Sequence, residues 1–266
     1  MASGSSFYYS FLFLPQERRR AITALYAFCR EVDDVVDECS DAQLARTKLA
    51  WWRLEIGKLF ESNPNHPVTK ALQPHLANFG ITAERLDEII DGMEMDLTQT
   101  RYLDFAGLER YCYHVAGAVG LLAAGIFGYS NPRSLEYAKN LGTAFQLTNI
   151  IRDVGEDARK GRIYLPMDEL KKFEVPAADL LQARYSDNFR KLMAFQAARA
   201  NEFYRKAFDA LPSEDRKTQR AGLIMAAIYR ATLAEVERDG FKVLTQRASL
   251  TPLRKLWLAW KTWVSA

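Results

Sequence analysis

Residues 30–38 read REVDDVVDE, so an arginine and a group of acids share nine positions with three valines. On a helix of 3.6 residues per turn, one face carries four charged side chains and the valines point elsewhere. These four are Arg30, Asp33, Asp34 and Asp37. Carboxylates one turn apart repel each other unless a cation lies among them. The stretch therefore predicts either a solvated acidic face on a helix or a site for a cation.

A second polar stripe lies in residues 146–157, which read QLTNIIRDVGED. Helical spacing places four oxygen-bearing side chains of this stretch on one face, namely Gln146, Asn149, Asp153 and Asp157. Oxygen ligands suit Mg²⁺, which usually takes one or two carboxylates and completes its shell with water and phosphate oxygens. Two such stripes favour facing Asp pairs that bind Mg²⁺, with Mn²⁺ as an alternative, and a diphosphate. Four basic residues within and after the stripe could contact the same anion: Arg152, Arg159, Lys160 and Arg162.

The rest of the chain carries helical periodicity and almost no strand pattern. Asp41 and Thr82 have the positions of helix N-caps, and the glycine- and alanine-rich stretches suggest tightly packed central helices. The expected helices cover residues 15–32, 41–59, 82–97, 105–127, 134–154, 178–211 and 213–240, with a last one from residue 251. The chain contains no linker or short repeat, so we expect one all-α domain over residues 1–266.

Composition excludes several classes of protein. Lys and Arg number 36 and Asp and Glu 33, well mixed along the chain, which is no footprint for nucleic acid. Three cysteines without metal-ligand spacing indicate reduced thiols in a cytoplasmic protein. The longest weakly polar run is too short to span a bilayer, and the N-terminus lacks the features of a signal peptide. No GxGxxG motif follows a strand, and NADPH is not expected.

Four segments carry a recognisable family pattern: SSFYYSFLFLP (5–15), ALYAFCREVDDVVDE (24–38), YCYHVAGAVG (111–120) and FQLTNIIRDVGEDARKGRIYLP (145–166). Together they resemble the squalene and phytoene synthase family, the head-to-head prenyl transferases, and the resemblance extends over about residues 5–238. It implies the all-helical isoprenoid synthase fold, in which two Asp-rich motifs face each other at a central apolar cavity.

The resemblance also implies the roles of individual residues. The metal ligands would be Asp33, Asp37, Asn149, Asp153 and Asp157. The catalytic residues would be the four aspartates together with Tyr111 and Tyr229, the tyrosines as cation stabilisers or a proton relay. The substrate-binding residues would be Ser6, Phe7, Arg30, Gln146, Asn149, Arg152, Arg162 and Tyr164.

The reaction implied is the condensation of two farnesyl diphosphates to presqualene diphosphate. The segments SGSSFYYSFLFLP (3–15) and KLAWWRLEI (48–56) are similar to bacterial presqualene diphosphate synthases of hopanoid biosynthesis, so squalene-forming enzymes would act downstream. The alternatives within the family are phytoene, squalene and dehydrosqualene synthases. An alternative of another class is an inactive relative that binds lipid or assists assembly, which would normally have lost acids from one motif.

Three further features are weighed between a structural and a functional role. His114 is expected to be a satisfied helix histidine, and Asp91 and Asp96 of DGMEMD (91–96) to have structural or supporting roles. The C-terminal stretch TPLRKLWLAWKTWVSA (251–266) predicts a basic amphipathic helix. Such a helix either docks on the core with its tryptophans in a groove or contacts the inner face of the membrane peripherally.

Overall fold

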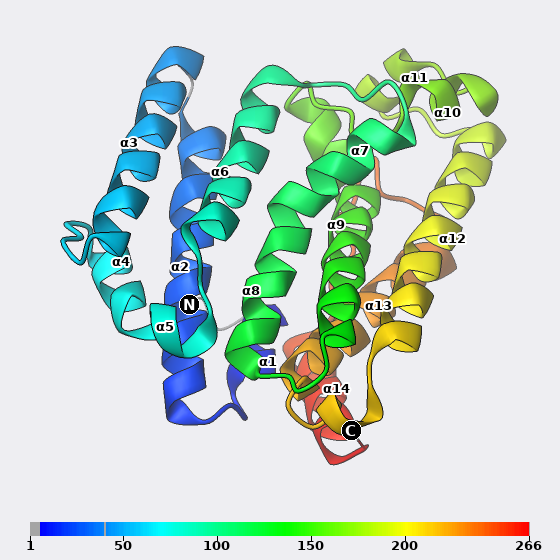
Figure 1. Cartoon of the computed structure of the whole chain (residues 1–266). Helices are drawn as coiled ribbons and strands as arrows, with labels where there is room; N and C mark the ends of the chain where they lie inside the picture. The colour runs from blue at the N-terminus through cyan, green and yellow to red at the C-terminus, as the bar shows by residue number, and fades with distance from the viewer. Residues whose placement is uncertain (1–5, 40, 266) are drawn as a thin grey trace.

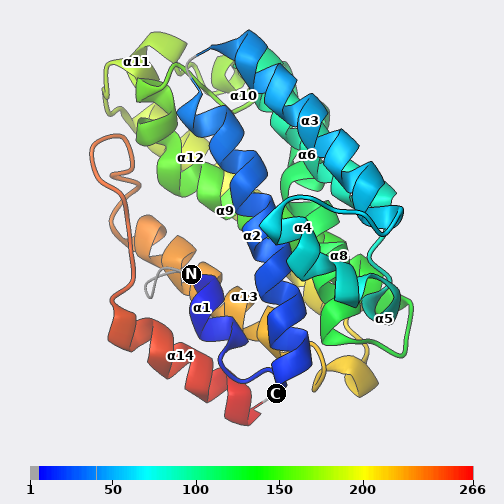
Figure 2. The same cartoon turned by 90° about the vertical axis from the view of Figure 1, so that its left-hand side faces the viewer.

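Helix α9 (Arg133–Arg159) runs through the middle of a helical bundle in the computed structural model, which describes residues 6–39 and 41–265 (Figures 1 and 2). The other helices are α1 (Ser6–Phe11), α2 (Gln16–Glu38), α3 (Ala42–Phe60), α4 (Pro67–Leu72), α5 (Leu76–Phe79), α6 (Ala83–Thr98), α7 (Phe105–Cys112), α8 (Ala118–Phe127), α10 (Met167–Lys172), α11 (Ala177–Leu181), α12 (Asp187–Ala210), α13 (Arg220–Arg238) and α14 (Pro252–Ser265). Short helical turns are η1 (Gln73–His75), η2 (Tyr113–Gly117) and η3 (Ser213–Asp215). Over the described residues the extended pairing is limited to one isolated bridge, Arg101 with Ile163, so the all-α prediction is confirmed.

Two helices begin where their capping residues predict. Asp41 Oδ1 accepts the backbone N–H of Gln43 at 2.8 Å at the start of α3, and Thr82 accepts that of Arg85 at 3.4 Å at the start of α6. An acceptor side chain at this position satisfies backbone donors that have no partner within the helix, which stabilises a helix by about 1 kcal/mol.

The central helices pack closely because glycines lie between them. A Cβ atom at Gly142 of α9 would lie 2.3 Å from the carbonyl oxygen of Ala116, and one at Gly120 would lie 2.5 Å from that of Ala138. Since no side chain fits at these distances, the backbones of η2 and α8 lie in direct contact with that of α9. The expectation of tightly packed central helices is confirmed.

Three long helices expected from periodicity are interrupted in the structure. Residues 105–127 form α7, a π-helical turn at η2, and then α8. Residues 178–211 break after α11, because Ala183 has a left-handed φ of 53° and Ser186 caps the new helix α12. The expected helix 213–240 begins as the short turn η3 and becomes α13 only at Arg220. Periodicity continues through each interruption, which is why the sequence did not reveal it.

The hydrophobic core has two large parts with a cavity at their junction. One part joins α9 to α7, α12 and α13, and the other joins α2 to α3, α6 and α8. Val115 and Phe145 pack against both parts, and both residues line the cavity. Among the described helices, none combines the length and apolar character needed to cross a membrane.

Candidate active site

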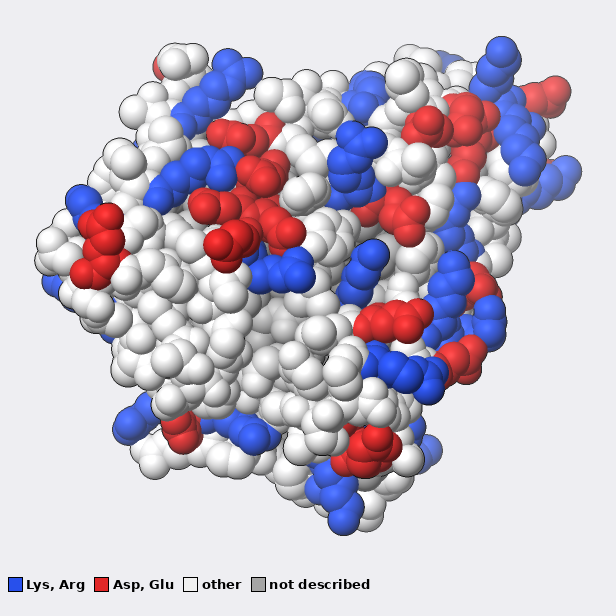
Figure 3. Space-filling view, viewed as in Figure 1, with Lys and Arg blue, Asp and Glu red and all other residues white. Residues whose placement is uncertain are grey.

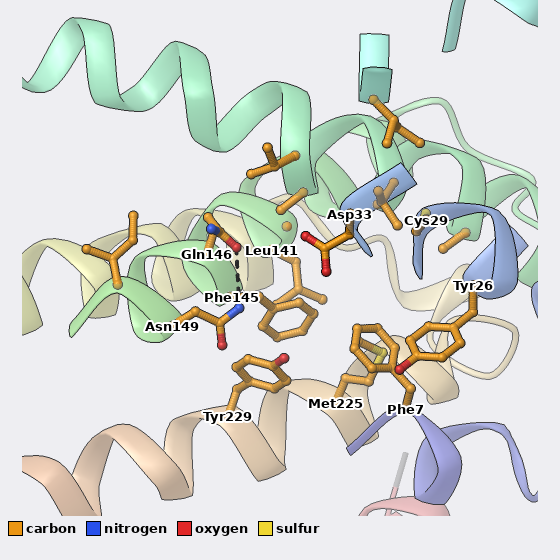
Figure 4. Close-up of a pocket in the computed structure, with 18 of the residues that line it drawn as sticks. Phe7, Tyr26, Cys29, Asp33, Leu141, Phe145, Gln146, Asn149, Met225 and Tyr229 are labelled. Atoms are coloured by element: carbon orange, nitrogen blue, oxygen red, sulfur yellow. Dashed lines mark hydrogen bonds between the residues drawn. The ribbon is translucent and has the colours of Figure 1, made fainter. Parts of the chain in front are cut away.

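The cavity has a volume of about 440 Å³ and is lined mainly by α2, α6, α8, α9 and α13. Its wall is largely apolar, as shown by Leu25, Ile89, Val119, Leu141 and Met225. Charged side chains gather where the C-terminal parts of α2 and α9 line the cavity. Figure 4 shows Asp33 on one side of this space, and Gln146 and Asn149 on the other.

The first Asp motif lies on α2. Asp33 and Asp37 line the cavity, as predicted, whereas Asp34 is not among the lining residues. Arg30 contacts Asp33 Oδ2 at 2.9 Å and Asp34 Oδ1 at 2.5 Å, so it is the cation within this acidic cluster. Burial and then the charge of Asp37 raise the pKa of Asp33 to about 6.

The second Asp motif lies on α9, and its four predicted side chains all line the cavity. Arg152 Nη2 contacts Asp153 Oδ2 at 2.5 Å, and Arg247 Nε contacts Asp153 Oδ1 at 2.8 Å. Burial disfavours ionisation of Asp153, but the two arginines outweigh it and hold its pKa below the ordinary value. Asp157 differs, because burial and then the charges of Asp153 and Glu156 raise its pKa to about 7.

Basic residues after α9 connect the two motifs. Arg162 Nη1 lies 3.1 Å from Asp37 Oδ1, and Lys160 Nζ lies 3.8 Å from Asp37 Oδ2. The segment is held in place by the bridge between Arg101 and Ile163 and by a hydrogen bond from Arg101 Nη1 to the carbonyl oxygen of Gly161 at 2.6 Å. The C-terminal part of α2 and the end of α9 therefore face each other, as expected.

The residues present fit divalent metal bound together with a diphosphate. Asn149 Oδ1 is buried and has no hydrogen-bond partner, so an oxygen donor is available beside the second motif. Over the described ranges, no three His, Cys, Asp or Glu side chains converge on one point. Each Asp pair would thus supply only part of a coordination shell, which is how Mg²⁺ is usually held when phosphate oxygens and water complete it.

A hydrogen-bonded group of two tyrosines and an aspartate lies beside the motifs. Tyr111 O–H donates to Asp96 Oδ2 at 2.8 Å and Tyr164 O–H donates to Asp96 Oδ1 at 2.7 Å, and the two rings stack 5.2 Å apart. Burial raises the pKa of Asp96 and also raises that of Tyr111 well above its ordinary value. Asp96, for which a structural or supporting role was expected, lines the cavity itself.

The remaining predicted tyrosine lies in an aromatic part of the wall. The ring of Tyr229 lies 4.5 Å from that of Phe145, and Phe7 of α1 lies 4.9 Å from Tyr26 of α2 (Figure 4). Phe7 lines the cavity, as expected. Ser6 begins α1, but its side chain lies outside the described part of the chain.

Sequence reasoning missed Arg247 of the segment between α13 and α14. Its guanidinium lines the cavity and reaches Asp153 across 94 residues of sequence. Arg247 has no regular sequence spacing relative to either motif. The sequence shows only that it is an arginine in a short irregular segment.

Two residues outside the cavity have the structural roles expected of them. His114 Nδ1 lies 3.0 Å from the carbonyl oxygen of Glu88, and Asp91 Oδ1 lies 2.7 Å from Arg53 Nη2. Arg53 also contacts Asp87 and Glu94, and Figure 3 shows acidic side chains gathered over α6 on this face. Cys29, Cys39 and Cys112 are free thiols.

Comparison with known proteins agrees with this geometry. Phytoene synthase of Arthrospira platensis is 36% identical over 264 residues, covering 94% of this chain and 85% of its own length. Phytoene synthase 1 of Solanum lycopersicum is 37% identical over 254 residues and covers 92% of this chain and 61% of its own length, so the chain spans under two thirds of that plant relative.

Solved structures show the same fold. A dehydrosqualene synthase in complex with a ligand superposes with a TM-score of 0.85 at 29% identity, covering 98% of this chain and 91% of its own. The squalene synthase HpnC from Alicyclobacillus acidocaldarius superposes with a TM-score of 0.80 at 28% identity. The match covers 88% of this chain and 89% of the HpnC chain. The sequence model of squalene/phytoene synthase matches residues 1–254. The chain therefore belongs to the squalene/phytoene synthase family of head-to-head prenyl transferases.

Proposed function

We propose that the protein condenses two farnesyl diphosphates head to head and forms presqualene diphosphate, in a reaction that depends on Mg²⁺. The observation that supports prenyl transfer is the placement of two Asp pairs and their arginines at one end of a cavity whose wall is otherwise apolar. The choice of farnesyl diphosphate and of this product rests on the similarity of residues 3–15 and 48–56 to presqualene diphosphate synthases. We expect the reaction to take place in the cytoplasm, with squalene-forming enzymes downstream.

Bound Mg²⁺ would stabilise the negative charge that develops on the leaving diphosphate as the allylic C–O bond breaks. Such stabilisation lowers the barrier by several kcal/mol. Asp33, Asp37, Asn149, Asp153 and Asp157 would hold it. Basic side chains of the protein would also bind the leaving diphosphate, because a guanidinium can bind two phosphate oxygens at once. Those near the motifs are Arg30, Arg152, Lys160, Arg162 and Arg247. In the structure several of them contact the Asp side chains, so binding of metal and diphosphate requires these ion pairs to rearrange.

The apolar part of the cavity protects the carbocation. Once diphosphate leaves C1 of the first donor, water would quench the cation unless the wall excludes it. The aromatic faces of Phe145, Tyr229 and Phe7 offer negative charge density without a lone pair that would trap the cation. The double bond between C2 and C3 of the second farnesyl diphosphate then attacks C1 of the cation formed from the first.

Loss of one proton closes the cyclopropane ring and completes the reaction. Tyr111, whose O–H donates a hydrogen bond to Asp96, would accept this proton on its oxygen while donating its own to Asp96. Burial raises the pKa of Asp96, which makes that carboxylate a better proton acceptor. One diphosphate and one proton leave, and the product retains the second diphosphate. No reductant takes part.

A second candidate is phytoene synthesis from two geranylgeranyl diphosphates. The observation that favours it is the 36–37% identity to phytoene synthases over more than nine tenths of this chain. Squalene and dehydrosqualene synthesis would begin with the same condensation. The inactive relative is disfavoured because both Asp motifs are complete and line the cavity.

Product analysis with competing substrates tests the proposal. Farnesyl and geranylgeranyl diphosphates are supplied together with Mg²⁺ and without NADPH, and the products are identified by mass spectrometry. The proposal expects a C30 diphosphate as the main product. Phytoene as the main product would support the second candidate instead, and absence of any coupled product would support the inactive relative.

A further inference from the structure

Helix α14 packs on α13 and α1 through one side only (Figure 2). Ala259 is fully buried there, and Leu258 and Trp263 are partly buried beside it. The ring of Trp263 stacks on that of Phe13 at 4.9 Å, and the guanidinium of Arg220 lies 4.8 Å from its centroid. The docked side therefore includes one tryptophan of α14.

The other side of α14 is apolar and exposed. We define the α14 outer face as five residues with their exposed fractions: Leu253 (80%), Leu256 (44%), Trp257 (53%), Trp260 (57%) and Val264 (66%). At about 100° per residue these positions span an arc of about 100°, on the side of the helix away from Leu258 and Thr262.

This arrangement departs from the docked alternative considered from the sequence. That alternative had the tryptophans of the amphipathic helix filling a groove in the core, but Trp257 and Trp260 point away from it. The helix is apolar on two sides, and the fold covers one. Exposing five large apolar side chains in a contiguous stripe is unfavourable in water, so the outer face has the character of a contact surface.

Charge indicates what covers this surface. Helix α14 contains three basic residues, Arg254, Lys255 and Lys261, and no acidic residue. Lys261 is exposed and lies 5.1 Å from the ring centroid of Trp257 at the edge of the outer face. Arg254 on the same flank contacts Glu235 of α13 at 2.6 Å. Tryptophan beside lysine or arginine is typical of helices that lie in the interface of an anionic bilayer.

We infer that the α14 outer face docks on the surface of an anionic lipid bilayer. A second copy of the chain fits less well, because a two-fold contact through this face would bring two basic flanks together with no acidic residue of α14 to pair with them.

The position of α14 suits a membrane-bound prenyl transferase. Helices α13 and α1, on which α14 packs, contribute Met225, Tyr229, Phe7 and Phe11 to the cavity wall. Docking would hold that wall one helix layer from the lipid, which would receive the C30 hydrocarbon part of the product. This last argument rests on the proposed function, whereas the surface itself does not.

Vesicle binding tests the inference without any turnover. The full chain is sedimented with phosphatidylcholine vesicles with and without phosphatidylglycerol, at low and high salt. The double variant Trp257→Ser/Trp260→Ser is compared with Leu44→Ser/Leu54→Ser, which removes two exposed apolar side chains from α3. We expect binding to anionic vesicles to fall at least about tenfold in the tryptophan variant and to remain unchanged in the α3 variant.

Thermal melting and turnover in detergent should match the wild type for both variants, which separates docking from folding and from catalysis. Equal vesicle binding by wild type and the tryptophan variant would overturn the inference. So would a dimer in sedimentation velocity that the tryptophan variant dissociates while wild type fails to bind vesicles, because the outer face would then be an interface between copies.

Discussion

Arg162 Nη1 donates a hydrogen bond to Asp37 Oδ1 at 3.1 Å, and these residues belong to segments 125 positions apart. The contact joins the residue just beyond the second Asp motif to the last aspartate of the first. Since the fold holds this arginine at the point where the motifs meet, it is placed to transfer from a carboxylate to a diphosphate when substrate and metal enter.

Replacing Arg162 should therefore weaken substrate binding and the chemical step together. We expect Arg162→Gln to lower kcat/KM by about a hundredfold, because a charge-assisted contact to the leaving group is lost. Arg162→Lys keeps the charge and should recover part of this loss. Steady-state kinetics with Arg184→Gln as control would show the effect, since the guanidinium of Arg184 contacts Asp179 at 3.8 Å and Arg184 does not line the cavity. Equal kinetics for Arg162→Gln and wild type would contradict the role.

The four motif aspartates should each be essential for turnover but not for folding. We expect Asp33→Ala, Asp37→Ala, Asp153→Ala and Asp157→Ala to reduce kcat by about a hundredfold or more. Glu31→Gln, on the exposed side of α2, is the matched control and should retain activity. Activity that survives both EDTA and the Asp33→Ala change would disprove the metal assignment.

The stability of the metal-free protein should depend on pH through Asp157. Its pKa is about 7 in the folded protein and 3.8 ordinarily, so the folded state binds more protons than the unfolded state between these values. The carboxyl therefore favours folding at low pH, and this contribution is lost as pH rises through about 7. Asp157→Asn should raise Tm relative to wild type at pH 8 in EDTA, and the difference should shrink progressively as pH falls to about 4. A lower Tm for the variant at pH 8 would contradict the burial of an unpaired charge.

The hydrogen bond between Tyr111 and Asp96 should be needed for turnover. Tyr111→Phe removes the proton acceptor and its hydrogen bond to Asp96, and we expect kcat to fall about a hundredfold with KM nearly unchanged. Asp96→Asn should have a similar effect on kcat. Tyr113→Phe, which removes an O–H bonded to Glu88 outside the cavity, is the control. Equal loss in Tyr113→Phe would point to a structural cause.

Arg247 should help to keep the pKa of Asp153 in the second motif low. Because it helps Arg152 lower the pKa of Asp153, Arg247→Gln should raise that pKa and shift the rise of activity with pH towards higher pH. Lys242→Gln, an exposed position of the same segment, is the control. A pH profile that Arg247→Gln leaves unmoved would mean that the contact has no effect on the motif.

The helices and motif faces could be predicted because they depend on local sequence. The caps at Asp41 and Thr82 and the spacing of Asp33, Asp37, Asp153 and Asp157 are set within a few residues, and side chains three, four or seven positions apart share a helix face in any fold. That the two faces lie across one cavity was expected from their oxygen ligands and from the family resemblance, and the structure agrees.

Features that depend on contacts distant in sequence could not be predicted. The approach of Arg247 to Asp153 and the convergence of Tyr111 and Tyr164 on Asp96 depend on how segments pack. The same reason applies to α14, since its periodicity shows an apolar face but not which side the rest of the protein covers.

The stoichiometry of diphosphate release tests the central claim most directly. Purified protein is incubated with farnesyl diphosphate with Mg²⁺ or EDTA and without NADPH, and inorganic diphosphate is counted against substrate consumed and product mass. We predict one diphosphate released for every two substrates, with a C30 monodiphosphate formed only when Mg²⁺ is present. Release of one diphosphate per substrate without any coupled C30 product would contradict head-to-head condensation at this site.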